Sequence, residues 1–238
     1  MLLKTSIPVR KLLNKWLAPT GYRIERISRF AHELQALTLR PERRLKFVQI
    51  GANDGVRFDG LYGFVTRHPC SGIVVEPLPD VFERLCANYA DYPLIVPVNK
   101  AIHETAGVLP LFRVAPDALV RYSGWAAGIA SFDRSHLLRH DIAPGDIIEQ
   151  PVSCTPLMQL LEDTATLDAD LLQIDAEGYD SAILRMTDFA RFRPRLIKYE
   201  HKAMTPAERA AHDARLARHG YRSVVEGADT IVWQSSPG

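Results

Sequence analysis

The sequence has few cysteines and no long apolar run. Only three of its 238 residues are cysteine, at positions 70, 86 and 154, and no two of them form a Cys-x-x-Cys pair. This argues against a disulfide framework or a thiolate metal centre and favours a reducing compartment, so we expect a cytoplasmic protein. Lys and Arg interrupt every apolar stretch near the N-terminus. We therefore expect neither a signal peptide nor a membrane span.

The chain has no large excess of charge of either sign, but its charged residues are unevenly distributed. Residues 1–46 contain 11 Lys and Arg against 3 acidic residues, whereas the remainder contains 18 against 25. Apolar residues in the first segment recur at helical spacing between the basic ones, which predicts a basic amphipathic extension over residues 1–45 and one globular domain over residues 46–238. The extension could pack on the domain or on a second copy in a homo-oligomer, or it could make peripheral contact with a membrane or polyanion. The acidic balance of the domain disfavours nucleic acid as a partner.

A short apolar run that ends in two nearby glycines is the central feature of the chain. It reads Phe47-Val48-Gln49-Ile50-Gly51-Ala52-Asn53-Asp54-Gly55. The apolar residues predict a buried strand, and the glycines predict a tight turn with a helix shortly after it. Because glycine has no Cβ, such a turn lets a ligand approach the backbone. An ordinary strand-to-loop turn is the alternative.

A second apolar strand, over residues 71–75, ends in Glu76, and Pro77 prevents Glu76 from starting a helix. In a doubly wound sheet this carboxylate lies beside the Gly51 turn, where it can accept hydrogen bonds from both hydroxyls of a ribose. A solvated acid at a strand end is the alternative.

Strands and helices alternate from residue 47 onward. This pattern predicts an α/β fold, a doubly wound and mostly parallel sheet that a C-terminal antiparallel hairpin completes. The expected strands are 47–50, 71–75, 94–98, 171–174 and 196–199, and the hairpin joins 221–225 to 230–234. Helices are expected over 79–89, 155–161 and 206–219 and after Asp180. Residues 103–153 are the least regular, and their small-residue loop around Trp125 could cover the ligand or pack on the sheet.

Four blocks of the sequence occur together in an order that resembles a known family. They are Gln49 to Gly55, Val75 to Leu85, Asn99 to Ile102 and Leu172 to Asp180. In this order they look like the FkbM family of S-adenosylmethionine-dependent methyltransferases, and the likeness runs from about Phe47 to about His201. The resemblance implies a class I, Rossmann-like fold and S-adenosyl-L-methionine as cofactor. It also implies O-methylation of a hydroxyl group on a saccharide or secondary metabolite.

The resemblance, with the strand-end pattern, selects candidate site residues. Cofactor contacts are expected from Gln49, Gly51, Ala52, Asn53, Asp54, Gly55, Glu76, Pro77, Asn99, Ala101 and Asp175. Gln49 stands where many class I methyltransferases carry an acid for the methionine amino group, and Asn53 replaces a glycine.

Catalysis needs a base if the acceptor is a hydroxyl. Asp175, His201 and His140 are the candidates, and Asp175 could instead hold the methionine amino group or orient the acceptor. Mg²⁺ held by Asp175, Glu177 and Glu200 is conceivable, but the spacing does not require it, so we expect no metal.

Two other classes of protein share part of this pattern. An NAD-dependent oxidoreductase would have the glycine turn and Glu76, but its fingerprint would place glycines where Asn53 and Val56 stand. A binding module that keeps the fold without turnover is the second alternative.

Overall fold

Within the residues that the structure describes, the main sheet has seven strands, five of them parallel. The computed structural model describes residues 16–17, 19, 28–39, 44–57 and 60–234. The strand order is β10-β11-β9-β8-β1-β2-β3. The five strands from β9 to β3 run parallel to one another, and β11 is antiparallel to both β9 and β10. The bounds are β1 Leu45–Ile50, β2 Cys70–Val75, β3 Ile95–Val98, β8 Leu171–Ile174, β9 Leu196–Glu200, β10 Tyr221–Glu226 and β11 Asp229–Gln234. This confirms the predicted fold class, including the closing hairpin.

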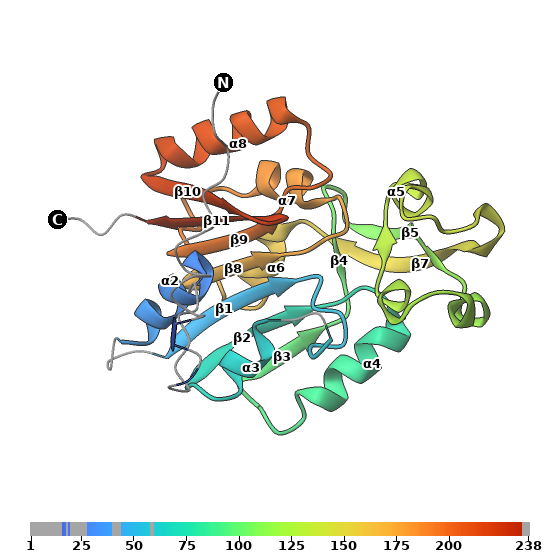
Figure 1. The fold of residues 1–238 in the computed structure, drawn as a ribbon, viewed down its shortest axis with the longest axis horizontal. Coiled ribbons are helices and arrows are strands. Elements are labelled where there is room, and N and C mark those ends of the chain that lie inside the picture. The colour runs from blue at the N-terminus through green and yellow to red at the C-terminus, as the bar shows by residue number, and fades with distance from the viewer. Residues whose placement is uncertain (1–15, 18, 20–27, 40–43, 58–59, 235–238) are drawn as a thin grey trace.

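Helices cover both faces of this sheet (Figure 1). On one face lie α2 (Arg29–Thr38), α3 (Tyr62–Val65) and α4 (Pro79–Asn88); on the other lie α6 (Leu157–Asp163), α7 (Asp180–Met186) and α8 (Pro206–Arg218). Side chains alternate along a strand, so Phe47 joins the first core and Val48 the second, and both are fully buried. Burial on both faces explains why the neighbouring residues Phe47 and Val48 of β1 are both apolar.

A second, four-stranded sheet projects beside the first. Its strands, in the order β4-β7-β5-β6, are β4 (Ala101–Ile102), β5 (Gly107–Val114), β6 (Ala130–Ser131) and β7 (Ile147–Thr155). The chain between them forms α5 (Arg134–Arg139) and three 3-10 helices, η2 (Pro116–Arg121), η3 (Gly124–Ala127) and η4 (Pro144–Asp146). Figure 1 shows this part in green and yellow at the right of the molecule. Residues 103–153, which looked least regular in the sequence, therefore contain strands of this second sheet and the short helices between them.

The second half of the basic extension packs on the domain. Leu34 of α2 is buried in the core, and Phe30 and Leu37 pack against the same cluster. The guanidinium of Arg29 lies 4.6 Å from the ring centroid of Trp233 on β11. Residues 1–15 lie outside the described residues, so the extension as a separate unit stays a prediction. Among the described residues, no helix is both long and apolar enough to cross a membrane.

Candidate functional site

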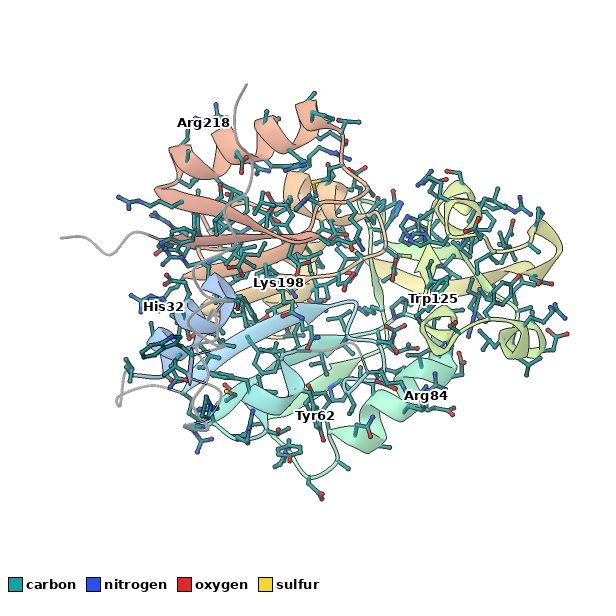
Figure 2. All side chains as sticks on the ribbon, viewed as in Figure 1. His32, Tyr62, Arg84, Trp125, Lys198 and Arg218 are labelled. Carbon is teal, nitrogen blue, oxygen red and sulfur yellow. The ribbon has the colours of Figure 1, made fainter. Side chains whose placement is uncertain are left out.

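A cleft of about 230 Å³ opens at the carboxyl ends of the parallel strands, between the two sheets. Its floor includes residues from the ends of β1, β2, β8 and β9, and its roof includes η3, β6 and His140. Figure 2 places Trp125, one of the roof residues, in the part of the chain around the second sheet. Of the residues expected to contact cofactor, the cleft is lined by Gln49, Gly51, Ala52, Asn53, Glu76, Pro77, Ala101 and Asp175.

Gly51 allows two loops to meet at the centre of this floor. Its φ is +74°, and its N–H, like that of Ala52, donates to the carbonyl of Val75, at 3.0 and 2.9 Å. The N–H of Asp175 in turn donates to the carbonyl of Ile50 at 2.9 Å. A Cβ on Gly51 would lie 1.7 Å from the carbonyl oxygen of Asp175. Only glycine fits here, for its conformation and for its lack of volume.

The rest of the glycine block departs from expectation. Asp54 is buried, and its Oδ1 accepts the N–H groups of Val56 and Arg57, at 3.0 and 2.8 Å. Asp54 therefore closes the turn on itself and does not line the cleft, and Gly55 lies against Tyr89 instead. The expected helix, α3, begins only at Tyr62 and is four residues long. The part of the cleft next to β1 is therefore formed by the glycine turn and not by the N-terminus of a helix.

Glu76 is buried at the end of β2, as its position after the strand predicted. Its Oε2 accepts the N–H of Asn53 at 3.0 Å and its Oε1 the N–H of Leu78 at 2.9 Å. Burial raises the pKa of this carboxyl to about 7, although the two backbone hydrogen bonds oppose the shift. Each carboxylate oxygen has a second lone pair, so Glu76 can still accept hydrogen bonds from a ligand in the cleft.

Asn99 lies just outside the cleft and supports Glu76 from behind. Its Nδ2 donates to the carbonyl oxygens of Glu76 and Pro77, at 2.8 and 3.1 Å. The amide NH2 of Asn99 is therefore used by the backbone that carries Glu76, and Asn99 is not among the residues that line the cleft, so its contact with the cofactor stays a prediction.

Asp175 follows β8, exposed to the cleft yet deep between its walls. Enclosure raises the pKa of its carboxyl to about 8, and the charges of Glu177, Asp180 and Glu200 add to the shift, whereas Lys198 opposes it. Asp180 itself is buried and accepts the N–H groups of Ala176 and Glu200, at 3.1 and 3.0 Å. It thus ties the loop after β8 to the end of β9. The acid in the first turn of α7 has a structural role that the sequence did not reveal.

The roof is attached to this loop through Glu177, a residue with φ +47°. Ser131 Oγ donates to the carbonyl of Glu177 at 2.8 Å, and Nε2 of the buried His136 lies 3.0 Å from its Oε2. The Nδ1 of His140 lies 3.0 Å from the carbonyl of His136. Because a carbonyl only accepts, Nδ1 carries a proton and the Nε2 of neutral His140 keeps its lone pair. His140 lines the cleft, so this nitrogen is suited to act as a base.

His201 is not at the cleft, which corrects its assignment as a candidate base. Its side chain is buried against the hairpin, and its Nδ1 lies 3.0 Å from Oγ1 of Thr230. Burial lowers the pKa of this imidazole. Glu200, the residue before it, lines the cleft and lies 3.0 Å from Lys202. A strand-end position indicated the correct edge of the sheet but not the direction of the side chain.

The cleft also contains residues that the sequence did not single out. Gln173 and Tyr179 line it, the first from within β8 and the second from the loop that follows. The Tyr179 ring stacks on His103, with centroids 5.3 Å apart, and tilts against Phe132 at 5.1 Å. Tyr179 belongs to the Leu172 to Asp180 block, so the family resemblance of that block could have identified it as a site residue.

A central Gly51 turn, a buried acid after the next strand and the strand order β3-β2-β1-β8-β9-β11-β10 together define a class I methyltransferase fold. A family model described as "Methyltransferase FkbM domain" matches residues 49–223, well over half of the chain, and the protein belongs to this family. It is therefore a methyltransferase with S-adenosyl-L-methionine as its cofactor, as the sequence blocks predicted.

Solved structures similar to this chain include three methyltransferase proteins. A human methyltransferase 10 domain containing protein is 12% identical over 95% of this chain and 96% of its own, with a TM-score of 0.44. The N-terminal domain of human METTL16 in complex with SAH is 13% identical over 95% and 81%, with a TM-score of 0.46. An FkbM methyltransferase from Methylobacillus flagellatus KT is 13% identical over 80% and 43%, with a TM-score of 0.44. Comparison with curated proteins gives no match.

The residues of the cleft fit this cofactor. The Oε1 of Gln49 is buried at the cleft floor without a hydrogen-bond partner, although native proteins rarely leave such an acceptor unsatisfied. Glu76 supplies a carboxylate on one side of the Gly51 turn and Asp175 supplies one on the other. The cofactor has ribose hydroxyls, an ammonium and a sulfonium charge, which these groups can bind. Among the described residues, no group of three or more His, Cys, Asp and Glu side chains could hold a metal.

Proposed function

We propose that the protein methylates a hydroxyl group on a saccharide or secondary metabolite. The observation that carries this proposal is the position of Asp175, which is exposed to the cleft, has a pKa of about 8 and lies on the same cleft as His140. Bound S-adenosylmethionine would supply an activated methyl group, which an oxygen can take as the carbon–sulfur bond breaks. The chain would need only to align the acceptor and remove its proton.

The site residues divide into two groups in this proposal. Gly51, Ala52, Asn53 and Pro77 shape the floor, Glu76 accepts hydrogen bonds from the ribose hydroxyls, and Gln49 and Asp175 face the methionine end. On the acceptor side, either Asp175 or His140 takes the proton. Both atoms that would receive it, a carboxylate oxygen and the His140 Nε2, have an unused lone pair.

The charges at the acceptor end favour a small acceptor without phosphates. Asp175, Glu177 and Glu200 all line this end, and Lys202, which also lines it, is paired with Glu200. The carboxylates of Glu177 and Glu200, joined by Asp175 above its pKa of about 8, repel a phosphate backbone, which supports the expectation that nucleic acid is not the acceptor. Tyr179 adds an aromatic face on which a sugar ring can pack.

A transfer assay tests the proposal. Protein supplied with S-adenosylmethionine that carries a labelled methyl group is expected to label at least one member of a panel of saccharides and hydroxylated metabolites. Calorimetry with S-adenosylmethionine and NAD runs beside it. Binding of NAD alone would support an oxidoreductase, and cofactor binding with no transfer to any acceptor would support a binding module.

Substitution of Glu76 tests the cofactor side separately. Glu76→Ala is expected to weaken S-adenosylmethionine binding by roughly 1 to 3 kcal/mol, because two ribose hydroxyls lose a charged acceptor. Calorimetry measures the effect, and Glu83→Ala on the exposed side of α4 is the matched control. Since Glu76 also holds two backbone N–H groups, circular dichroism checks that the variant is folded. An unchanged dissociation constant in folded protein would remove Glu76 from the site.

A further inference from the structure

Two glutamine side chains lie next to each other on the floor of the cleft. Gln49 on β1 and Gln173 on β8 are register partners in adjacent parallel strands, so both side chains point to the same face of the sheet. Both line the cleft, yet they are only 2% and 6% exposed. From the sequence, a cofactor contact is expected for Gln49 but not for Gln173.

Both glutamines bury an amide oxygen that nothing in the described protein satisfies. The Oε1 atoms of Gln49 and Gln173 have no hydrogen-bond partner. The flanking strands do not supply one either. The register partner of Gln49 on β2 is Val74, which is apolar, and that of Gln173 on β9 is Lys198, whose ammonium lies 3.1 Å from the Asp229 carboxylate. Buried acceptors without donors cost stability, so a pair of them on one wall of a cleft indicates a ligand with several donors.

We propose that Gln173 and Gln49 together bind the methionine ammonium of S-adenosylmethionine. An ammonium has N–H donors and no acceptor, and an amide oxygen is an acceptor. If Glu76 at the end of β2 takes the ribose, the amino-acid end lies on the other side of β1, toward β8. There Asp175, two residues after Gln173, can supply the negative charge that the two neutral amides lack. This inference rests on the cofactor assignment and adds a binding residue to it.

Gln173→Met tests the inference, because it keeps the length of the side chain and removes the acceptor. Its dissociation constant for S-adenosylmethionine, measured by calorimetry, is expected to rise about tenfold or more. Affinity for 5′-methylthioadenosine, which has the same adenosine and sulfur but no amino-acid part, is expected to stay unchanged. The melting temperature of the free protein should not fall, since an unsatisfied buried oxygen has been removed. Gln159→Met, at an exposed position of α6, is the control.

Each other outcome overturns the inference in a recognisable way. Equal loss of both ligands would mean that Gln173 only shapes the floor, and unchanged S-adenosylmethionine binding would mean that it contacts no donor of the ligand. If Gln173→Met does not fold, Gln173→Glu retains an acceptor and is expected to keep the preference for S-adenosylmethionine over 5′-methylthioadenosine. Loss of that preference in folded Gln173→Glu would refute the role. Wild-type protein that binds neither ligand would refute the cofactor assignment itself.

Discussion

Gly51→Ala is expected to abolish measurable S-adenosylmethionine binding and to lower the free energy of unfolding by about 2 to 5 kcal/mol. Two costs add up. Alanine at φ +74° is in the left-handed region, which costs about 1 to 2 kcal/mol. Its Cβ would also lie 1.7 Å from the Asp175 carbonyl oxygen, so the loops after β1 and β8 must separate. Because both loops line the cleft, their separation changes the floor on which the cofactor lies.

Gly220→Ala separates these two costs. Gly220 has a φ of +83°, but a Cβ there would have no heavy atom within 4 Å. This variant therefore bears the conformational cost without the overlap, and it lies after α8, away from the cleft. Denaturant unfolding and calorimetry on the two variants give the comparison. Equal destabilisation, with cofactor binding intact in Gly51→Ala, would show that the close approach of the two loops does not shape the site.

The main sheet could be predicted from sequence because its strands are short apolar runs with clear boundaries. β1 and β8 are buried on both faces and end in small or acidic residues, which makes both their type and their ends readable. β7 was missed for the opposite reason. Pro151 lies within it opposite Pro110 of β5, and proline in a run argues against a strand. Much of β7 is also exposed, which weakens the apolar signal.

The candidate site was predicted where a strand end fixes the position of a side chain, and less well elsewhere. Glu76 and Asp175 follow parallel strands, so topology alone brings them to one edge. His201 follows a strand as well, but the sequence does not reveal that its imidazole lies within hydrogen-bond distance of Thr230, outside the residues that line the cleft. Gln173 lies inside β8, where the sequence predicts a core residue. Its importance depends on its register with Gln49, a contact between distant parts of the chain.

Asp175→Asn and His140→Gln are expected to differ from each other, and the difference identifies the base. The variant that removes the base should lower the turnover of the labelled acceptor by about 10²- to 10⁴-fold. His140→Gln should leave S-adenosylmethionine affinity nearly unchanged, because His140 follows α5 beside the second sheet, whereas the residues assigned to the cofactor lie at the strand ends of the main sheet. Asp175→Asn should weaken that affinity if the carboxylate contacts the ammonium, and should lower turnover alone if it only takes the proton. Asp91→Asn at an exposed position is the control.

The pH dependence of turnover provides an independent criterion. A base acts only when deprotonated, and the pKa of Asp175 is raised to about 8 in the free protein. If Asp175 is the base, kcat/KM should therefore rise with pH up to about 8, since this ratio reports the ionisation of the free enzyme. That rising limb should disappear in Asp175→Asn and persist in His140→Gln. If the rising limb instead persists in Asp175→Asn and disappears in His140→Gln, the His140 Nε2 is the base that takes the acceptor's proton. Full turnover in both variants would mean that neither group takes the proton and that alignment of the acceptor in the cleft accounts for the rate.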